Sequence, residues 1–407
     1  MLAFGEALEK ILRLARRSIP VKISIGDSLG SVLAQEIKAR EAIPLFDSSS
    51  VDGFAVRVCD LKNASEQNQI RLPVASTISA GSGAPRSLKA LQTMKIMTGA
   101  PLPRGTDAVV MKELVRVRGN EVVFTSAAKE GSNLRRRGEE FSKGESVLSK
   151  GTVITPPVVG LLATLGYEEV KVYRKPSIAL VITGNEVRSP SQLLRRGQIR
   201  DSNSYAIASV LRTIGIKPAL VLRVRDKREA LSKAFARAIK KADVVISAGG
   251  ISVGDFDFVK EVLNDLRVET VFWRVAMKPG KPNYFGTRGS KLVFGLPGNP
   301  VSALVSLEML VLPALQKIMG LPRAAELNRP AVIETEFRRS PGRVEFVRAV
   351  ASQLPDGHFS VRPVSGQGSH MVVGLAAANC LIILSEDKER IEKGESVIIR
   401  FLSWTKL

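Results

Sequence analysis

Glycines, a serine and aspartates gather in residues 248–257, a segment that suits the binding of an anionic group (AGGISVGDFD). Glycine lets a backbone approach an anion closely, and the start of a following helix offers free backbone N–H groups. Asp257 falls in the first turn of the predicted helix, where a carboxylate also favours the helix dipole. Because glycine-rich turns also arise for purely structural reasons, both interpretations stay open for this segment alone. Its candidate anion-binding residues are Gly249, Gly250, Ser252 and Gly254.

Residues 277–286 place two lysines beside a rigid bend (MKPGKPNYFG). Lys278 and Lys281 flank a Pro-Gly pair, so both ammonium groups are expected in one loop. A solvated turn explains such a pair equally well. The segment is not a P-loop, since Lys281 is followed by proline rather than by Ser or Thr.

Residues 295–303 form a third expected loop (GLPGNPVSA). Asn299 is the candidate N-cap of a helix and Pro300 its first residue, so capping alone accounts for both. Capping does not account for Pro297, which precedes a glycine and indicates a loop shaped around a ligand.

Two further segments supply carboxylates. Glu186 lies in residues 183–187 (TGNEV), directly after a predicted strand. Asp52 lies in residues 46–55 (FDSSSVDGFA) before Gly53, and an Asp-Gly pair also favours a simple turn. Together with the loops above, these residues predict a site for a phosphorylated, polyanionic small molecule, with carboxylates that hold a metal ion.

Alternating strand and helix signals from residue 176 to about residue 321 must position these loops. Near-continuous apolar strands such as SIALVIT and ADVVIS, separated by helices, predict a mostly parallel sheet covered on both faces. Ligands bind beyond the carboxyl ends of such strands, which is where the loops fall. Asp226 and Glu229 predict a capping box at the start of one of the helices.

The rest of the chain has a different pattern of predicted secondary structure. Short β-like runs separated by glycine and proline turns extend from residue 51 to about residue 150. Residues 20–45 are expected to be a connector with a short helix near residues 29–35, and a helix is expected in residues 157–166. Beyond residue 327 helix signals vanish, and successive strands predict a small barrel or sandwich.

These patterns predict a multidomain α/β plus β protein. It has a central three-layer α/β domain with a mostly parallel sheet, an inserted β-rich domain, a helical and extended linker domain, and a C-terminal β-barrel-like domain. The predicted boundaries are 1–50 with 145–175 for the linker domain, 51–144 for the insert, 176–326 for the α/β domain and 327–407 for the C-terminal domain.

Composition limits the chemistry. Lys and Arg number 60 against 39 Asp and Glu, and the resulting net charge of +21 favours anionic partners. Two cysteines and two histidines do not suffice for a conventional structural zinc site, so the expected metal is a hard cation such as Mg²⁺ bound by carboxylates. Aromatic residues make up 5% of the chain and no nucleic-acid-binding motif occurs, so nucleic acid is not an expected partner.

The chain is expected to be cytoplasmic and without a membrane span. Residues 1–17 predict an amphipathic helix with Leu8 and Ile11 on its apolar face, and Glu6 and Glu9 interrupt what a signal peptide would need. Residues 301–315 are the most membrane-like stretch, but serines, a glutamate and a proline leave it too short and too broken to span a bilayer.

The sequence resembles the molybdopterin molybdenumtransferase (MoeA-type) family, which is related to the C-terminal domain of gephyrin. The resemblance covers nearly the whole chain. The motifs that carry it, in order, are PLFDSSSVDGFAV, IMTGAPLPRGTDAVV, NLRRRGEE, VITGNEV, GQIRDSN, AGGISVGDFDF, AMKPGKPNYFG, GLPGNPVSA, GRVEF followed by Arg348, and GQGSH.

The resemblance implies an enzyme that inserts molybdenum from molybdate into adenylylated molybdopterin and releases AMP in a step that needs a divalent cation. It also implies a homodimer, whose active cleft combines the α/β domain of one subunit with the β unit of the other, and partners among other proteins of molybdenum cofactor biosynthesis. By motif, the implied catalytic residues are Asp52, Thr98, Glu140, Glu186, Asp226, Asp257 and Lys278.

Further roles follow from the same resemblance. Glu186, Asp226 and Asp257 are the implied metal ligands, and Arg274 stands where the family commonly has lysine. Asn185 stands where the family usually has aspartate, which removes one carboxylate from the site. The implied substrate-binding residues, beyond the glycine-rich loop, are Arg274, Lys281, Pro297, Pro300, Arg348 and Ser369.

Two other functions compete with this interpretation. Sibling enzymes that adenylylate molybdopterin share the α/β domain, but they lack the β-rich insert and the C-terminal β domain. A scaffold protein is the other alternative, since gephyrin shows that the fold serves that role, and the retained acidic and basic positions argue against it.

Overall fold

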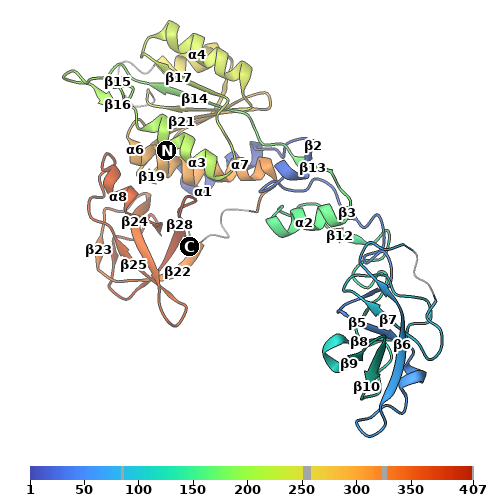
Figure 1. The fold of residues 1–407 in the computed structure, drawn as a ribbon. Helices are drawn as coiled ribbons and strands as arrows, with labels where there is room; N and C mark the ends of the chain where they lie inside the picture. Colours follow the sequence, from blue (N-terminus) through green and yellow to red (C-terminus); the bar gives the residue numbers. More distant parts are fainter. Residues whose placement is uncertain (84–86, 251–257, 323–327, 406–407) are drawn as a thin grey trace. The chain divides into compact units, whose positions relative to one another are not determined.

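The computed structural model describes residues 1–407 except 84–86, 251–257, 323–327 and 406–407. These residues form two compact units (Figure 1). The large unit comprises Met1–Ala34, Val153–Pro156 and Glu169–Leu407, and the small unit comprises Gln35–Thr152 and Pro157–Glu168. The finer boundaries expected at residues 50, 144, 175 and 326 stay predictions.

A mixed β-sheet organises the first half of the large unit. Its four parallel strands adjoin a pair of antiparallel ones, so the sheet is less uniformly parallel than expected. The strands, in spatial order, are β17 (Leu220–Val224), β14 (Ile178–Thr183), β18 (Val244–Ala248), β21 (Lys291–Leu296), β20 (Pro282–Arg288) and β19 (Glu269–Lys278).

Strand β20 corrects the prediction that residues 277–286 form a loop. Lys278 ends β19 and Pro282 begins β20, so the turn between them is short. Aromatic packing stabilises this hairpin and its contact with the sheet: the ring centroids of Trp273 and Tyr284 lie 5.4 Å apart within it, and those of Phe285 and Phe294 lie 4.9 Å apart between β20 and β21.

Helices cover both faces of the sheet, as predicted (Figure 1). Successive residues of a strand point to opposite faces, and β14 follows this rule: Leu180 packs into the cluster with α3, while Val181 packs into the cluster with α4. The helices on the first face are α1 (Phe4–Leu14), α3 (Asn203–Thr213), α6 (Pro300–Ser306) and α7 (Leu312–Met319), and those on the second are α4 (Arg228–Lys241) and α5 (Phe258–Asp265).

Helix α1 is amphipathic, as expected, and buries Ala7 and Ile11. It packs against β19 and α7 as part of the α/β core, whereas the predicted boundaries assign it to a linker domain. Strand β1 (Leu2–Ala3) precedes it and pairs with β19.

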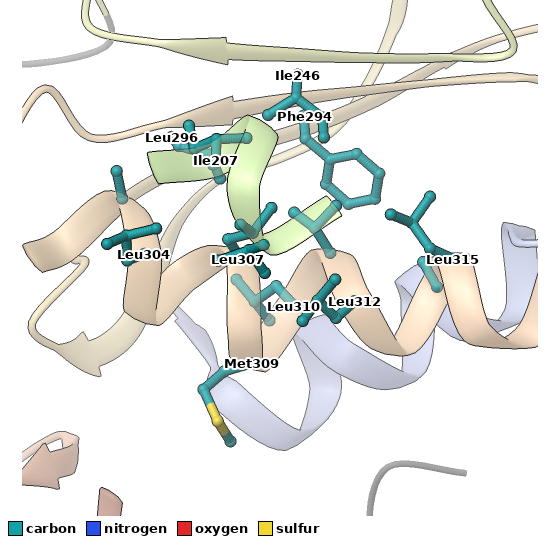
Figure 2. Packing of buried hydrophobic residues seen from close by; sticks show 14 of the residues in the cluster. Ile207, Ile246, Phe294, Leu296, Leu304, Leu307, Met309, Leu310, Leu312 and Leu315 are labelled. Carbon is teal, nitrogen blue, oxygen red and sulfur yellow. The ribbon is translucent and has the colours of Figure 1, made fainter. Parts of the chain in front are cut away.

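A π-helical segment, η4 (Leu307–Val311), joins α6 to α7 into one apolar helical run, Pro300–Met319. The run is longer than the broken stretch expected from sequence, and its length and composition would suit a membrane span, but 89% of its most apolar window is buried. Leu307 lies on the side of the helix toward Phe294 of the sheet, and Met309 lies on the opposite side (Figure 2). It is a core helix.

The C-terminal strands form a closed barrel, because each of five strands pairs with two neighbours. They are, in order around the barrel, β24 (Val344–Gln353), β25 (Phe359–Pro363), β22 (Asn328–Ile333), β28 (Ser396–Phe401) and β26 (Cys380–Leu384). A short pair, β23 (Phe337–Arg338) with β27 (Arg390–Ile391), and a short helix α8 (Val372–Ala376) accompany it. Helix α8 is a correction, since no helix was expected there.

The chain segment near residue 33 is extended rather than helical. Leu33 is buried and forms a bridge with Val172 of β13 (Glu169–Tyr173), which in turn pairs with β2 (Pro20–Ser24). Its apolar residues are therefore buried by strand-like pairing, which overrides the weak helical pattern. The remaining short elements here are η1 (Ile25–Asp27) and the parallel pair β15 (Val187–Arg188) with β16 (Ile199–Arg200).

The small unit is built on a six-stranded sheet, which confirms the β texture predicted for this region. Its strands, in spatial order, are β8 (Ala108–Met111), β5 (Gly53–Val56), β7 (Thr93–Ile96), β6 (Ile70–Ile78), β10 (Glu121–Phe124) and β9 (Val115–Arg118). The other elements are η2 (Val58–Leu61), η3 (Lys112–Leu114), the pairs β3 (Ile37–Lys38) with β12 (Ser146–Leu148) and β4 (Ser48–Ser49) with β11 (Leu134–Arg135), and α2 (Pro156–Thr164), whose first residue belongs to the large unit.

Candidate functional site

A cavity of about 570 Å³ lies at the carboxyl edge of the parallel strands, where α/β folds bind ligands. The ends of β14 and β18 and the starts of α3 and α6 surround it. It brings together six of the predicted site residues, namely Glu186, Asp226, Gly249, Gly250, Pro297 and Pro300. We refer to it as the acidic cavity.

Gly249 shows why glycine follows β18. Its φ of 94° is unfavourable for other residues, and a Cβ there would lie 2.5 Å from the backbone oxygen of Thr183. Gly250 also has a positive φ, of 63°. Only glycine allows the chain to pass so close to the end of β14. Ser252, Gly254 and Asp257 lie outside the described residues.

Asp226 presents a carboxylate to the acidic cavity, and its Oδ1 is buried without a hydrogen-bond partner in the described part of the chain. Burial is the largest influence and raises the pKa of this carboxyl; the neighbouring Thr183 hydroxyl and the Asn185 backbone lower it by less, and the negative charge of Glu186 raises it. The predicted capping box of Asp226 and Glu229 is wrong, because α4 begins at Arg228 and no side chain caps it. The backbone N–H of Asp226 instead donates to Asn185 Oδ1 at 3.2 Å.

The predicted metal ligands are brought together only in part. Glu186 and Asp226 line one cavity, while Asp257 lies outside the described residues, and no group of three or more His, Cys, Asp or Glu side chains forms among the rest. A buried carboxylate oxygen without a partner, beside a second negative charge, is nevertheless the arrangement that a hard cation satisfies. The two carboxylates therefore fit a cation such as Mg²⁺.

Asp201 and Asn203 line the same cavity and were not selected as site residues from sequence. Asp201 is buried; it accepts hydrogen bonds from Arg223 Nε at 2.6 Å and from the Ser204 N–H at 2.9 Å. Asn203 donates to the Gly298 oxygen at 2.8 Å and so fixes the loop before α6. The only sequence signal was the polar run 201–203 within the motif GQIRDSN.

A second cavity, of about 360 Å³, adjoins the first and shares Pro282, Pro297 and Asn299 with it. Three of its charged lining residues are positive, namely Lys278, Lys281 and Arg343. The fourth is the carboxylate of Glu345. We refer to it as the cationic pocket. It lies where the α/β sheet meets the barrel, because the register Lys278↔Glu345 joins β19 to β24.

Ser369 lines the cationic pocket, whereas Arg348 is buried and is not among its lining residues. Arg348 is 1% exposed, and its guanidinium donates to the backbone oxygens of Gly366 at 2.9 Å and Gly368 at 3.1 Å. Burial lowers its pKa. The side chain thereby holds the loop that carries Ser369, whereas direct contact with an anion was predicted for it.

Asn299 connects this loop to helix α6. It occupies the N-cap position as predicted, yet its side chain caps no backbone group. Its Nδ2 donates instead to Ser369 Oγ at 3.1 Å. Arg274 lines a different, more open cavity together with Lys281 and Trp273.

The predicted site residues of the small unit form a group of their own. Asp52 Oδ1 accepts hydrogen bonds from the N–H and the hydroxyl of Thr98, both at 2.9 Å, and Lys112 Nζ lies 3.2 Å from Oδ2. These hydrogen bonds from Thr98, together with Lys112, lower the pKa of Asp52 to about 2. No hydrogen bond or ion pair in the described residues joins Glu140 to this group.

Gly53 explains the Asp-Gly pair better than a turn does. It begins strand β5, and a Cβ there would lie 2.2 Å from the Val110 oxygen of the neighbouring strand β8. The glycine is therefore required by close strand contact, and the turn interpretation is wrong.

Comparisons with known proteins agree with this architecture. Residues 2–166 match the MoeA N-terminal region (domain I and II), residues 179–317 match a probable molybdopterin binding domain, and residues 330–402 match the MoeA C-terminal region (domain IV). The molybdopterin molybdenumtransferase of Bacillus subtilis (strain 168) is 36% identical over 96% of this chain and 92% of its own length. That of Haemophilus influenzae is 35% identical over 98% of both chains.

Two solved structures of a molybdopterin biosynthesis MoeA protein from Pyrococcus horikoshii have TM-scores of 0.83 and 0.80. Both are 29% identical to this chain, cover 100% and 98% of it, and are themselves covered in full. With matches of this length and identity, the chain belongs to the MoeA family of molybdopterin molybdenumtransferases.

Proposed function

We propose that this protein is a transferase of molybdenum cofactor biosynthesis, which inserts molybdenum from molybdate into adenylylated molybdopterin and releases AMP. Its family membership supports the overall reaction. The single observation that carries the chemistry is the pair of adjoining cavities, one lined by carboxylates and a glycine turn and the other mostly by cations. A phosphorylated substrate and an oxyanion thereby meet at the residues that both cavities share.

The acidic cavity would bind the adenylylated substrate. Gly249 and Gly250 allow its phosphates to approach the backbone, and the N-terminus of α6 at Pro300 attracts negative charge. Asp226 and Glu186 would hold the divalent cation, for which we propose Mg²⁺, with Asp257 as the third ligand. When bound, the cation neutralises phosphate oxygens and stabilises the leaving AMP.

The cationic pocket would bind molybdate, which is a substrate here. Lys278 and Lys281 supply ammonium groups, and Ser369 supplies a hydroxyl donor from the barrel side. Arg348 acts by holding the loop of Ser369.

We further propose a cytoplasmic homodimer, in which the Asp52 and Thr98 group of one subunit contributes to the cleft of the other. The family resemblance supports this arrangement. The same resemblance favours contacts with other proteins of molybdenum cofactor biosynthesis.

The test is AMP release by the purified protein from adenylylated molybdopterin, with and without molybdate and Mg²⁺. We expect release only when both are present, and its loss in Asp226→Asn and Asp257→Ala variants. Release without molybdate, or tight substrate binding without any release, would contradict the proposed transfer. Binding of neither substrate nor oxyanion would favour a scaffold.

A further inference from the structure

Lys278 does not stand alone at the wall of the cationic pocket. Its Nζ lies 2.9 Å from Glu345 Oε1, and the two residues are register partners across the junction of β19 and β24. The Lys278 side chain is 46% exposed, whereas that of Glu345 is only 6% exposed. A buried carboxylate of the barrel therefore holds a half-exposed ammonium group of the α/β domain.

Glu345 is itself fixed from behind. Its Oε2 lies 3.2 Å from Arg339 Nε, and the Arg339 side chain is 1% exposed. The Arg339 guanidinium also donates to the backbone oxygen of Ser385 at 2.7 Å and to that of Arg343. Backbone oxygens thus fix the Arg339 guanidinium. Arg339 forms an ion pair with Glu345, and Glu345 forms one with Lys278.

This chain of contacts matters because lysine is flexible. Its four-carbon stem has many rotamers, and that conformational freedom is lost when the ammonium group is held in place. An ammonium group has three donors, so its ion pair with the single oxygen Oε1 of Glu345 leaves donors for an oxyanion. Misplacement of a reacting or orienting group by about 1 Å can slow a reaction about 100-fold.

We propose that Glu345 is a positioning residue that holds the Lys278 ammonium group at one place in the cationic pocket and moderates its charge. This inference rests on the proposed function. Glu345 does not attract an anion, since its carboxylate repels one. It places Lys278 for the transfer step at the expense of some ground-state affinity.

The first measurement separates turnover from binding in a Glu345→Gln variant. We expect the rate of AMP release at saturating molybdate to fall about 10-fold. The affinity for molybdate alone, measured by titration calorimetry, should stay unchanged or increase, because a repelling charge is gone. Weaker molybdate binding with an unchanged maximal rate would overturn the proposal.

A double-mutant cycle shows whether Glu345 acts through Lys278. In a Lys278→Met background, Glu345→Gln should change the rate of AMP release less than about 2-fold, because there is no ammonium group left to position. Equal effects of Glu345→Gln in both backgrounds would overturn the proposal. Glu345→Asp retains the charge but is one methylene shorter, so it should lose rate as Glu345→Gln does, and full activity there would argue against positioning.

Glu308 offers a matched control at the same domain junction. Its side chain is 1% exposed, its Oε1 lies 3.7 Å from Arg400 Nε of β28, and it lines neither cavity. Glu308→Gln should lower the melting temperature, as Glu345→Gln does, yet leave the maximal rate within about 2-fold of the wild type. An equal loss of rate in both variants would mean that Glu345 acts only through stability.

A crystal structure of each variant tests the position of Lys278 without any measurement of the reaction. Lys278 Nζ should leave its place or become disordered in Glu345→Gln and stay in place in Glu308→Gln. If the wild type binds molybdate without releasing AMP, the proposed function fails while these structures still decide the role of Glu345. An unmoved Lys278 in Glu345→Gln would overturn the role even in an active enzyme.

Discussion

Asp52 of the small unit and Asp226 of the large unit are both predicted catalytic aspartates, yet their surroundings are opposite. Asp52 receives two hydrogen bonds from Thr98 and an ion pair from Lys112, which lower its pKa to about 2. Asp226 is desolvated beside Glu186, its Oδ1 has no partner among the described residues, and its pKa is raised. The charge of Asp52 is balanced by Lys112, whereas Asp226 has no positively charged partner among the described residues.

The difference separates two uses of the same side chain. A satisfied carboxylate such as Asp52 has its position and its charge fixed in advance. A half-buried carboxylate with a raised pKa, such as Asp226, contributes less to folding once it is ionised, and a bound cation would offset that loss. The comparison therefore favours Asp226 over Asp52 as a ligand of the proposed cation, and the following variants test this prediction.

Asp226→Asn should have the largest effect. Loss of one carboxylate ligand should lower cation-dependent AMP release at least about 100-fold, since loss of an outer partner of a metal site already costs about 10- to 100-fold. In EDTA the variant should be more stable than the wild type, with a melting temperature higher by on the order of 2 °C, because an uncompensated buried charge is removed. Activity assays and thermal unfolding with and without Mg²⁺ measure both; destabilisation in EDTA would remove the contrast with Asp52.

Gly53→Ala should have the second-largest effect. It tests the backbone next to Asp52. The new Cβ would meet the Val110 oxygen, a backbone atom that cannot easily move. We expect a loss of about 3 kcal/mol in the free energy of unfolding of the small unit. Gly160→Ala in α2 is the matched control, since a Cβ there meets nothing within 4 Å and helix propensity favours alanine. Equal unfolding midpoints for the two variants in urea would contradict this expectation.

Asp52→Asn should alter the dependence of stability on pH. The folded-state pKa of about 2 lies below the ordinary value of 3.8, so the carboxylate stabilises the fold above pH 3.8, and this contribution is lost as the pH falls through about 2. The variant should therefore lose less stability than the wild type between pH 5 and pH 2. Asp226 has the opposite sign, because its raised pKa makes its contribution to folding disappear as the pH rises through that value. Urea unfolding midpoints across this pH range provide the comparison.

Asn299→Ala should have the smallest effect. It removes one exposed hydrogen bond to Ser369 and leaves both carboxylates untouched. We expect a loss of about 0.5 kcal/mol in stability and a modest rise in KM for molybdate, without a change in the Mg²⁺ dependence. A changed Mg²⁺ dependence would show that the acidic cavity and the cationic pocket are not separable.

Much of the fold could be predicted from local patterns. The alternation of apolar strands and helices gave the layered α/β domain, and short β runs gave the insert and the barrel, because residue period and turn chemistry are local properties. Predictions failed where packing overrides propensity. Residues near Leu33 look helical but pair as strands, and Pro282 begins a strand whose aromatic residues pack against those of both neighbouring strands.

The site could be predicted as a set of segments but not as an arrangement. The motifs named Glu186, Asp226 and Lys278, which line two adjoining cavities, and the catalytic roles of these residues stay predictions. They did not reveal that Arg348 is buried behind its loop, that Asp201 lines the acidic cavity, or that Glu345 holds Lys278. Each of these depends on contacts between residues far apart in the chain.

The sequence by itself determined the family, most of the element types and the presence of glycine- and lysine-bearing segments, because spacing and residue type are sufficient for those. Only the tertiary structure decided which charges are compensated. Whether a carboxylate is neutralised depends on the donors and cations within a few ångströms of it. That distinguishes Asp52 from Asp226 and places Glu345 between Lys278 and Arg339.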